Sequence, residues 1–213
     1  MRTTVIFAGP PEEDIDWADV SPGASLKFLQ RAWRVADDVT SDPGVDVTTG
    51  DVALRKTTHK MISEITTLVE GQRFNVIVAR CMELINAVRK AIDTGCGAND
   101  PAVREAVTFA AQAMSLFAPY VAEDMWELLG YQPSVASSSW PTADPALLVA
   151  DEVTMVVQVN GKVRGKIQVS PDVDEDQARQ LALADANVKR FVADKNIVKV
   201  IARLPRMLSL VVK

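Results

Sequence analysis

Three basic side chains alternate along one short segment of this 213-residue sequence: Lys162, Arg164 and Lys166. Alternate residues of a β-strand point to the same face, so an extended backbone here would place the three cations on one face, about 7 Å apart along the strand. A row of this kind can contact successive phosphates of a nucleic acid. It can equally protect the edge of a sheet against pairing with another chain. The three residues alone leave both interpretations open.

The region that follows these residues is also basic. Its further cations include Lys189, Arg190, Lys195, Lys199, Arg203 and Arg206. Phe191 is the only aromatic residue after position 150. Many cations with few aromatic rings favour a structured RNA, recognised by shape and backbone, over a single strand recognised base by base. The candidate RNA contacts are therefore Lys162, Arg164, Lys166, Lys189, Arg190, Lys199, Arg203 and Arg206.

Residues suited to catalysis or metal binding are few. His59 is the only histidine, and its helical surroundings predict a surface or helix-packing side chain. Two cysteines cannot form a disulfide framework or a zinc site. Cys81 falls on an apolar helical stripe, and Cys96 lies between two glycines that separate helices. The sequence has no phosphate loop of the Walker type. We therefore predict no catalytic residue, no metal site and no cofactor of its own.

The net charge of −5 conceals an uneven distribution. Residues 1–150 contain 12 Lys/Arg and 20 Asp/Glu, a net charge of −8, whereas residues 151–213 contain 11 and 8, a net charge of +3. Only the second region therefore has the basic excess that RNA binding favours. No apolar run approaches the ~20 residues of a membrane span, and the N-terminus lacks a secretory pattern. We expect a cytoplasmic monomer with no membrane partner.

Helical periodicity organises residues 1–131, which we predict to form a helical bundle. Ser21-Pro22 has the order of an N-cap followed by proline in the first turn. The helix that begins there would bury the stripe Leu26, Leu29, Trp33 and Ala36. Further helices are expected from Asp51 to Gly71, from Phe74 to Thr94, from Asp100 to Pro119, and from Pro119 to Gly130.

Residues 132–150 contain three prolines and four serines, which predicts a linker without helix or strand. After this segment, apolar residues recur at every second position, which predicts β-strands. A two-residue Asn160-Gly161 turn would pair Val157 with Arg164 and mix apolar and charged residues on one face. We therefore predict a three-residue loop that pairs Val157 with Val163.

Two short helices and two strands complete the predicted C-terminal domain, residues 151–213. The helices begin at Asp174, with Ala178, Leu181 and Ala182 buried, and at residue 187; the strands span 197–203 and 207–212. The chain is thus expected to be mainly α: a helical bundle followed by a small α/β domain.

Four segments of the sequence resemble the C-terminal portion of the bacterial leucyl-tRNA synthetase family, which are class I aminoacyl-tRNA synthetases. They are VVQVNGKVRGKIQV at 156–169, IFAGPPEEDIDW at 6–17, RFNVIVARCMELINAV at 73–88 and FAPYVAEDMWELLG at 117–130. The helical segments are shared loosely with valyl, isoleucyl and methionyl enzymes, so the corresponding part of a valyl- or isoleucyl-type enzyme stays an alternative. The hairpin segment at 156–169 is the one that indicates the leucyl enzymes in particular.

The sequence departs from the family at two positions. Gly165 stands where the family usually has alanine, a change expected to be harmless. The family tends to have Pro-Gly-Lys near its end, whereas this chain has Pro205-Arg206-Met207, so that lysine contact is not carried over and Arg206 is the candidate substitute. The signatures HIGH and KMSKS are absent, and the nearest string, at 59–63, lies within a predicted helix.

The resemblance implies a tRNA-docking part of an enzyme that joins leucine to tRNA(Leu) with ATP and Mg²⁺. Its partners would be tRNA(Leu) and the catalytic and editing domains of the same enzyme. The bundle would lie along the inside of the tRNA, and the small domain would contact the outer corner. An interaction scaffold that binds no RNA is the alternative from a different functional class.

Overall fold

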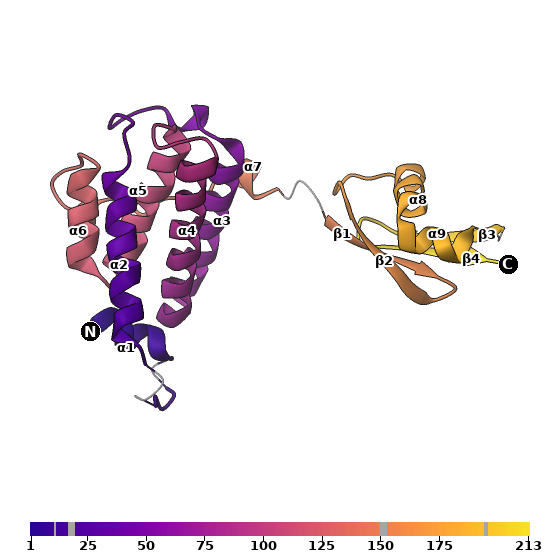
Figure 1. The fold of residues 1–213 in the computed structure, drawn as a ribbon, viewed down its shortest axis with the longest axis horizontal. Coiled ribbons are helices and arrows are strands. Elements are labelled where there is room, and N and C mark those ends of the chain that lie inside the picture. Colours follow the sequence, from indigo (N-terminus) through magenta and orange to yellow (C-terminus); the bar gives the residue numbers. More distant parts are fainter. Residues whose placement is uncertain (11, 17–19, 150–152, 194–195) are drawn as a thin grey trace. The chain divides into compact units, whose positions relative to one another are not determined.

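The computed structural model describes residues 1–10, 12–16, 20–149, 153–193 and 196–213 (Figure 1). It separates into two compact units, Met1–Leu148 and Val149–Lys213. Each unit has its own cluster of buried apolar side chains. The fold is mainly α, a helical bundle followed by a small α/β unit, which confirms the predicted class.

The helical unit is built around α5, most of whose side chains are buried. Its elements are α1 (Arg2–Ala8), α2 (Pro22–Asp37), η2 (Val47–Thr49), α3 (Val52–Glu70), α4 (Phe74–Thr94), α5 (Pro101–Ser115), α6 (Pro119–Leu128), η3 (Val135–Ser137) and α7 (Pro145–Leu148). The predicted caps are present: Ser21 accepts a hydrogen bond from the amide of Ala24, and Asp100 accepts one from the amide of Ala102. Helix α1 was not predicted, because no side chain caps it and its pattern is short.

The predicted buried face of α2 is correct only in part. Ala36 is buried and Leu29 packs against the core, but Leu26 is 55% exposed and Trp33 is 39% exposed. Phe28, Ala32 and Val35 are buried as well. Helix α2 carries two apolar stripes, and the one with small and β-branched side chains packs against α4 and α6. Small side chains let helices approach closely, which periodicity alone does not express.

The segment 132–150 is more ordered than a linker pattern predicts. It contains the short helices η3 and α7, and hydrogen bonds attach it to the helical unit. The indole Nε1 of Trp140 donates to Thr66 at 2.9 Å, and the amide of Asp144 donates to Nδ1 of His59 at 2.9 Å. Position 150 itself lies outside the described residues.

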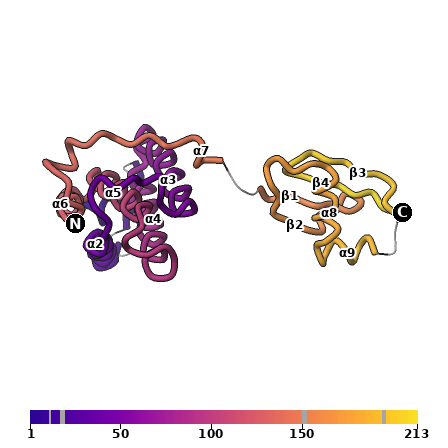
Figure 2. Tube along the Cα trace, turned by 90° about the horizontal axis from the view of Figure 1, so that it is seen from above, coloured from indigo at the N-terminus to yellow at the C-terminus, as the bar shows by residue number. Residues whose placement is uncertain are grey.

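The small unit is a four-stranded sheet in the order β2-β1-β4-β3, and Figure 2 traces the course of its chain. The pairs β1–β2 and β3–β4 are antiparallel, and β1–β4 is parallel. The elements are β1 (Val153–Val159), β2 (Lys162–Val169), α8 (Glu175–Ala184), α9 (Ala186–Val192), β3 (Ile197–Arg203) and β4 (Met207–Val212). The last two strands have the predicted bounds.

Helices α8 and α9 pack on one face of this sheet. Ala178, Ala182, Val188 and Val192 from the helices join the apolar side chains of β1 and β4 in one buried cluster. The prediction that Leu181 is buried is wrong, since this side chain is 45% exposed. Asp174 caps α8 as predicted, by accepting a hydrogen bond from the amide of Gln177 at 2.8 Å.

The hairpin register differs from the prediction. Val159 pairs with Lys162, so the loop has two residues, Asn160 and Gly161, with φ of 50° and 77°. Left-handed backbone at both loop positions is typical of a type I′ turn. The register then shifts: Val157 pairs with Gly165, and Arg164 is the extra residue of a β-bulge. The bulge resolves the mismatch of faces that argued against an Asn-Gly turn.

Candidate nucleic-acid interface

The bulge separates the three alternating cations. Cross-strand partners share a face of a sheet. Lys162 lies opposite Val159, whose side chain is buried on the helix-covered face, and Lys166 lies opposite Val156 on the other face. The expectation that Lys162, Arg164 and Lys166 share one face is therefore wrong. Counting alternate residues along the strand cannot detect this separation, because one inserted residue moves every residue after it to the other face of the sheet.

Arg164 is held by an aromatic ring. Its guanidinium carbon lies 3.8 Å from the centroid of the Phe191 ring on α9, within the range of a cation–π contact. Its Nε is buried and has no hydrogen-bond partner among the described residues. Both the stacking and the bulge direct this side chain toward the helix-covered face. The sequence shows both residues but gives no sign that they meet.

Asn160 connects the hairpin to the neighbouring strand. Its side-chain oxygen accepts a hydrogen bond from the amide of Val212 at 2.9 Å, and its side-chain nitrogen donates to the carbonyl of Val212 at 3.1 Å. Asn160 and Gly161 were predicted as structural turn residues, and their positive φ values fit that role. The turn therefore positions the cations on β2 without being a contact candidate itself.

The remaining candidate cations are exposed but lie on different elements. Lys189 and Arg190 are on α9, Lys199 and Arg203 are on β3, and Arg206 is in the turn between β3 and β4. Lys195 lies outside the described residues. The eight candidates thus form no single cluster.

One row of side chains crosses the whole sheet. Lys166 pairs with Val156, Val156 with Met207, and Met207 with Arg203. The two edge strands of the row thus carry cations, and the two central strands carry apolar side chains. We call the face that bears this row the open face, because within this unit α8 and α9 pack on the opposite one. Lys199 belongs to the open face by alternation along β3.

The strands and the helices of the small unit differ in charge. Within the described strands, Lys and Arg occur five times and Asp and Glu do not occur. The described carboxylates of this unit all lie in the segment 170–185, which includes α8 and the cap of α9. None of the ion pairs among the described residues involves Lys166, Lys199 or Arg203.

His59 is a helix-packing residue of the helical unit. Its Nε2 lies 3.0 Å from Glu105, which also accepts a hydrogen bond from Arg55 at 3.0 Å. Because the amide of Asp144 donates to Nδ1, the proton of the neutral ring sits on Nε2. This chain of bonds joins α3, α5 and the segment before α7. It holds the imidazole in place and leaves it no free nitrogen for catalysis.

The two cysteines differ in environment. Cys81 is fully buried in the core, and burial raises the pKa of its thiol to about 12. Cys96 is exposed; partial desolvation and then the carboxylates of Asp100 and Asp51 raise the pKa of its thiol. A raised pKa lowers the fraction of thiolate, which is the form in which a cysteine acts as a nucleophile.

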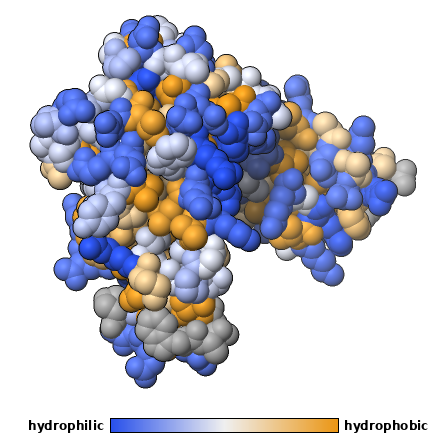
Figure 3. Space-filling view, turned by 60° about the vertical axis from the view of Figure 1, so that its left-hand side comes forward, coloured by the Kyte–Doolittle hydropathy of each residue, from blue (hydrophilic) through white to orange (hydrophobic). Residues whose placement is uncertain are grey.

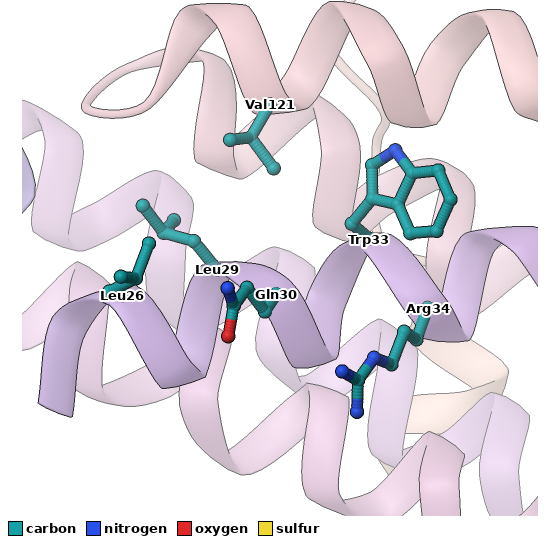
Figure 4. A pocket seen from close by; sticks show the side chains of 6 residues that line it. All are labelled: Leu26, Leu29, Gln30, Trp33, Arg34 and Val121. Atoms are coloured by element: carbon teal, nitrogen blue, oxygen red, sulfur yellow. The ribbon is translucent and has the colours of Figure 1, made fainter. Parts of the chain in front are cut away.

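A groove on the helical unit is lined by three of the four side chains that were expected in the core, Leu26, Leu29 and Trp33. Leu29 and Trp33 of α2 point toward Val121 of α6, with Gln30 and Arg34 alongside (Figure 4). Figure 3 shows apolar patches between hydrophilic ones on the surface of this unit. The groove is mostly apolar, and its lining offers no nucleophile.

The described residues contain no group of three or more His, Cys, Asp or Glu side chains placed to hold a metal ion. Their helices include none with the length and apolarity needed to cross a membrane.

Comparison with curated proteins gives close relatives along the whole chain. The leucine–tRNA ligase of Paenarthrobacter aurescens (strain TC1) is 57% identical over 211 residues, which are 99% of this chain and 25% of that protein. The leucine–tRNA ligase of Nocardioides sp. (strain ATCC BAA-499 / JS614) is 55% identical over 212 residues. That of Tropheryma whipplei (strain Twist) is 38% identical over 213 residues. The chain spans about a quarter of the length of these relatives.

A solved structure shares the fold. The agnB2 LeuRS of Agrobacterium radiobacter K84, determined as a ternary complex with tRNA and LeuAMS, matches with a TM-score of 0.77 at 22% identity. The match covers 100% of this chain and 28% of that one. The family model described as the anticodon-binding domain of tRNA ligase matches residues 51–179, more than half of the sequence. The chain therefore belongs to the family of tRNA ligase anticodon-binding domains.

Proposed function

We propose that the chain is the tRNA-binding C-terminal part of a leucine–tRNA ligase, and that it docks tRNA(Leu) for leucylation. The distribution of charge carries the proposal: in a member of this family, the four strands of the small unit have five Lys/Arg and no Asp/Glu. The eight candidate contacts are Lys162, Arg164, Lys166, Lys189, Arg190, Lys199, Arg203 and Arg206. The high identity to leucine–tRNA ligases supports leucine over the valyl or isoleucyl alternative.

We further propose that leucine activation takes place outside this chain. The sequence contains neither HIGH nor KMSKS, so its residues do not fit an ATP site of the class I type. ATP and Mg²⁺ would act in the catalytic domain of the same enzyme, which with the editing domain would be the protein partner of this chain. We place this function in the cytoplasm and expect the chain to be a monomer.

Binding to tRNA(Leu) tests the proposal directly. Each phosphate neutralised by a cation contributes about 0.7–0.9 to the slope of log affinity against log salt. If three or four of the candidate cations act, the slope has a magnitude of about 2–4. A gel-shift titration from about 50 to 200 mM salt measures it. Absence of binding at ~100 mM salt would contradict the proposal and favour the scaffold alternative.

The absence of activation can be measured independently. We expect no leucine-dependent ATP–pyrophosphate exchange from the chain, because it has no signature for holding ATP. A full-length leucine–tRNA ligase in the same assay is the positive control. Turnover by the chain alone would show that the assignment of activation to another domain is wrong.

A further inference from the structure

The cations of the small unit divide between two unlike surfaces. Lys166, Lys199 and Arg203 lie on the open face, in a part of the sheet that has no Asp or Glu within the described strands. Lys189 and Arg190 lie on α9, on the side that also carries the carboxylates of segment 170–185. A phosphate near the helices therefore meets both signs of charge, whereas one near the open face meets cations only.

We propose that the open face of the small unit, and not the side that bears α8, α9 and the Arg164–Phe191 stack, contacts the backbone of a structured RNA. This inference rests on the proposed function and adds to it the surface that is used. Charge complementarity selects the occupant, since a polyanion matches a surface whose only charges are positive.

The spacing of the row suits two separate backbone contacts. Lys166 and Arg203 are on the two edge strands, three strand spacings apart, which is about 14 Å at the backbone. Val156 and Met207 between them form an apolar strip. One phosphate cannot reach both ends, so the two cations would contact different positions along or across the RNA backbone.

Neutral polar side chains lie beside this strip. Gln158 lies in the adjacent cross-strand row, opposite the buried Ser209, and Gln168 lies on the same face of β2 by alternation. The two glutamine side chains can donate to and accept from ribose 2′-hydroxyls. Double-stranded RNA displays 2′-hydroxyls in a wide, shallow minor groove, which the open face of a sheet can approach. The class of ligand is therefore base-paired RNA in preference to a flexible single strand.

A pair of charge reversals tests which surface acts. In the whole chain, Lys166→Glu with Arg203→Glu changes the open face, and Lys189→Glu with Arg190→Glu changes the competing candidate contacts on α9. Both double variants change the net charge by the same amount. We expect the open-face variant to weaken tRNA binding about tenfold or more and to lower the magnitude of the salt slope by about 1.4–1.8, for two lost phosphate contacts. We expect the α9 variant to weaken binding less than the open-face variant does, because the proposal assigns the contacts to the open face.

The outcomes separate this inference from the proposed function. Failure of the unmodified chain to bind tRNA contradicts both. Binding that the α9 variant weakens as much as or more than the open-face variant contradicts the choice of surface alone. Thermal unfolding of each variant establishes that the small unit is folded, so that a loss of binding is not a loss of structure.

A footprint of the unmodified chain avoids the question of folding altogether. Met207 is half-buried at the centre of the open face, and Phe191 is exposed on the helix side. Hydroxyl-radical labelling, read by mass spectrometry, should show Met207 protected by tRNA and Phe191 unchanged. Protection of Phe191 without protection of Met207 would overturn the proposal. A tRNA footprint confined to the helical unit would do the same.

Discussion

Gly165 and Val188 share a small space between the sheet and α9. A Cβ atom at position 165 would lie 2.9 Å from Cγ2 of Val188 and 3.2 Å from Oδ1 of Asp185. That oxygen caps α9 by accepting hydrogen bonds from the amides of Asn187 and Val188. Glycine therefore fits this position, whereas the alanine that is usual in the family would not, because the neighbours of Gly165 leave no room for a methyl group.

Gly165→Ala should lower the free energy of unfolding of the small unit by about 1–3 kcal/mol, as overpacking does. Chemical denaturation followed by far-ultraviolet circular dichroism measures the change. Adding Val188→Ala should recover part of the loss by making space, and a double-mutant cycle would show this coupling. Gly23→Ala in α2 is a control of opposite sign, since nothing lies within 4 Å of that Cβ. A Gly165→Ala variant as stable as the parent would refute the prediction.

The two thiols should react very differently. Cys81 is buried and its pKa is raised to about 12, so at pH 8 it presents no accessible thiolate. Cys96 is exposed, and its raised pKa slows its reaction without preventing it. Iodoacetamide at pH 8 should therefore label Cys96 alone in the folded chain and both residues in denaturant. Mass spectrometry after digestion identifies the labelled site, and labelling of native Cys81 would contradict the structure.

At the scale of elements, one carboxylate joins two helices. Oδ1 of Asp100 accepts hydrogen bonds from the amide of Ala102 at 2.8 Å and from the amide of Asp51 at 3.0 Å. It therefore caps α5 and fixes the start of α3, whose own cap is Asp51. Two helix N-termini depend on this single side chain.

Asp100→Ala should destabilise the helical unit by about 2 kcal/mol, since it removes a helix cap and a second hydrogen bond. Asp100→Asn should cost less, because the amide oxygen can still accept. Asp42→Ala, at an exposed site of the same helical unit, is the control. Urea unfolding followed by tryptophan fluorescence gives the comparison. Equal stability of the alanine and asparagine variants would argue against the hydrogen bonds as the cause.

The sequence predicts elements better than it predicts their faces. Caps such as Ser21-Pro22 and Asp100-Pro101 locate helix starts, because a cap is a local interaction. Helix α2 has two apolar stripes in its sequence. Which of them is buried depends on how the neighbouring helices pack against it. The hairpin register depends on one inserted residue, Arg164, which no turn signal marks. Both errors concern tertiary context, which local patterns do not contain.

The candidate interface was predictable in its residues and not in its geometry. Basic composition after position 150 identifies the cations, and the alternation on β2 identifies the strand. The row from Lys166 to Arg203 joins strands that are far apart in the sequence through the parallel pairing of β1 with β4. Nothing in the local sequence of either strand specifies that partner.

At the scale of the whole molecule, the two units have separate cores. The buried clusters of the helical unit and the small unit share no residue. The four tryptophans are at positions 17, 33, 126 and 140, and all precede the small unit. Tryptophan fluorescence therefore reports on the helical unit alone.

A substitution in the core of one unit should leave the unfolding transition of the other unit unchanged. Phe109→Ala should lower the stability of the helical unit by about 3–5 kcal/mol and move the fluorescence transition. Val157→Ala should leave that fluorescence transition unchanged and destabilise the sheet, as followed by amide hydrogen exchange. A fluorescence shift caused by Val157→Ala would show that the two units unfold as one.

The bulge also has a consequence for chain length. Arg164 is the residue by which β2 exceeds its partner strand in the hairpin, so the ladder on either side of it does not depend on its presence. Removing it would bring Val163 and Gly165 into consecutive pairs opposite Gln158 and Val157, with the Asn160-Gly161 turn and every later pair intact. This hairpin should therefore tolerate the loss of one residue here without a shift in the register of the sheet. The extra residue, Arg164, adds a guanidinium that stacks on the ring of Phe191.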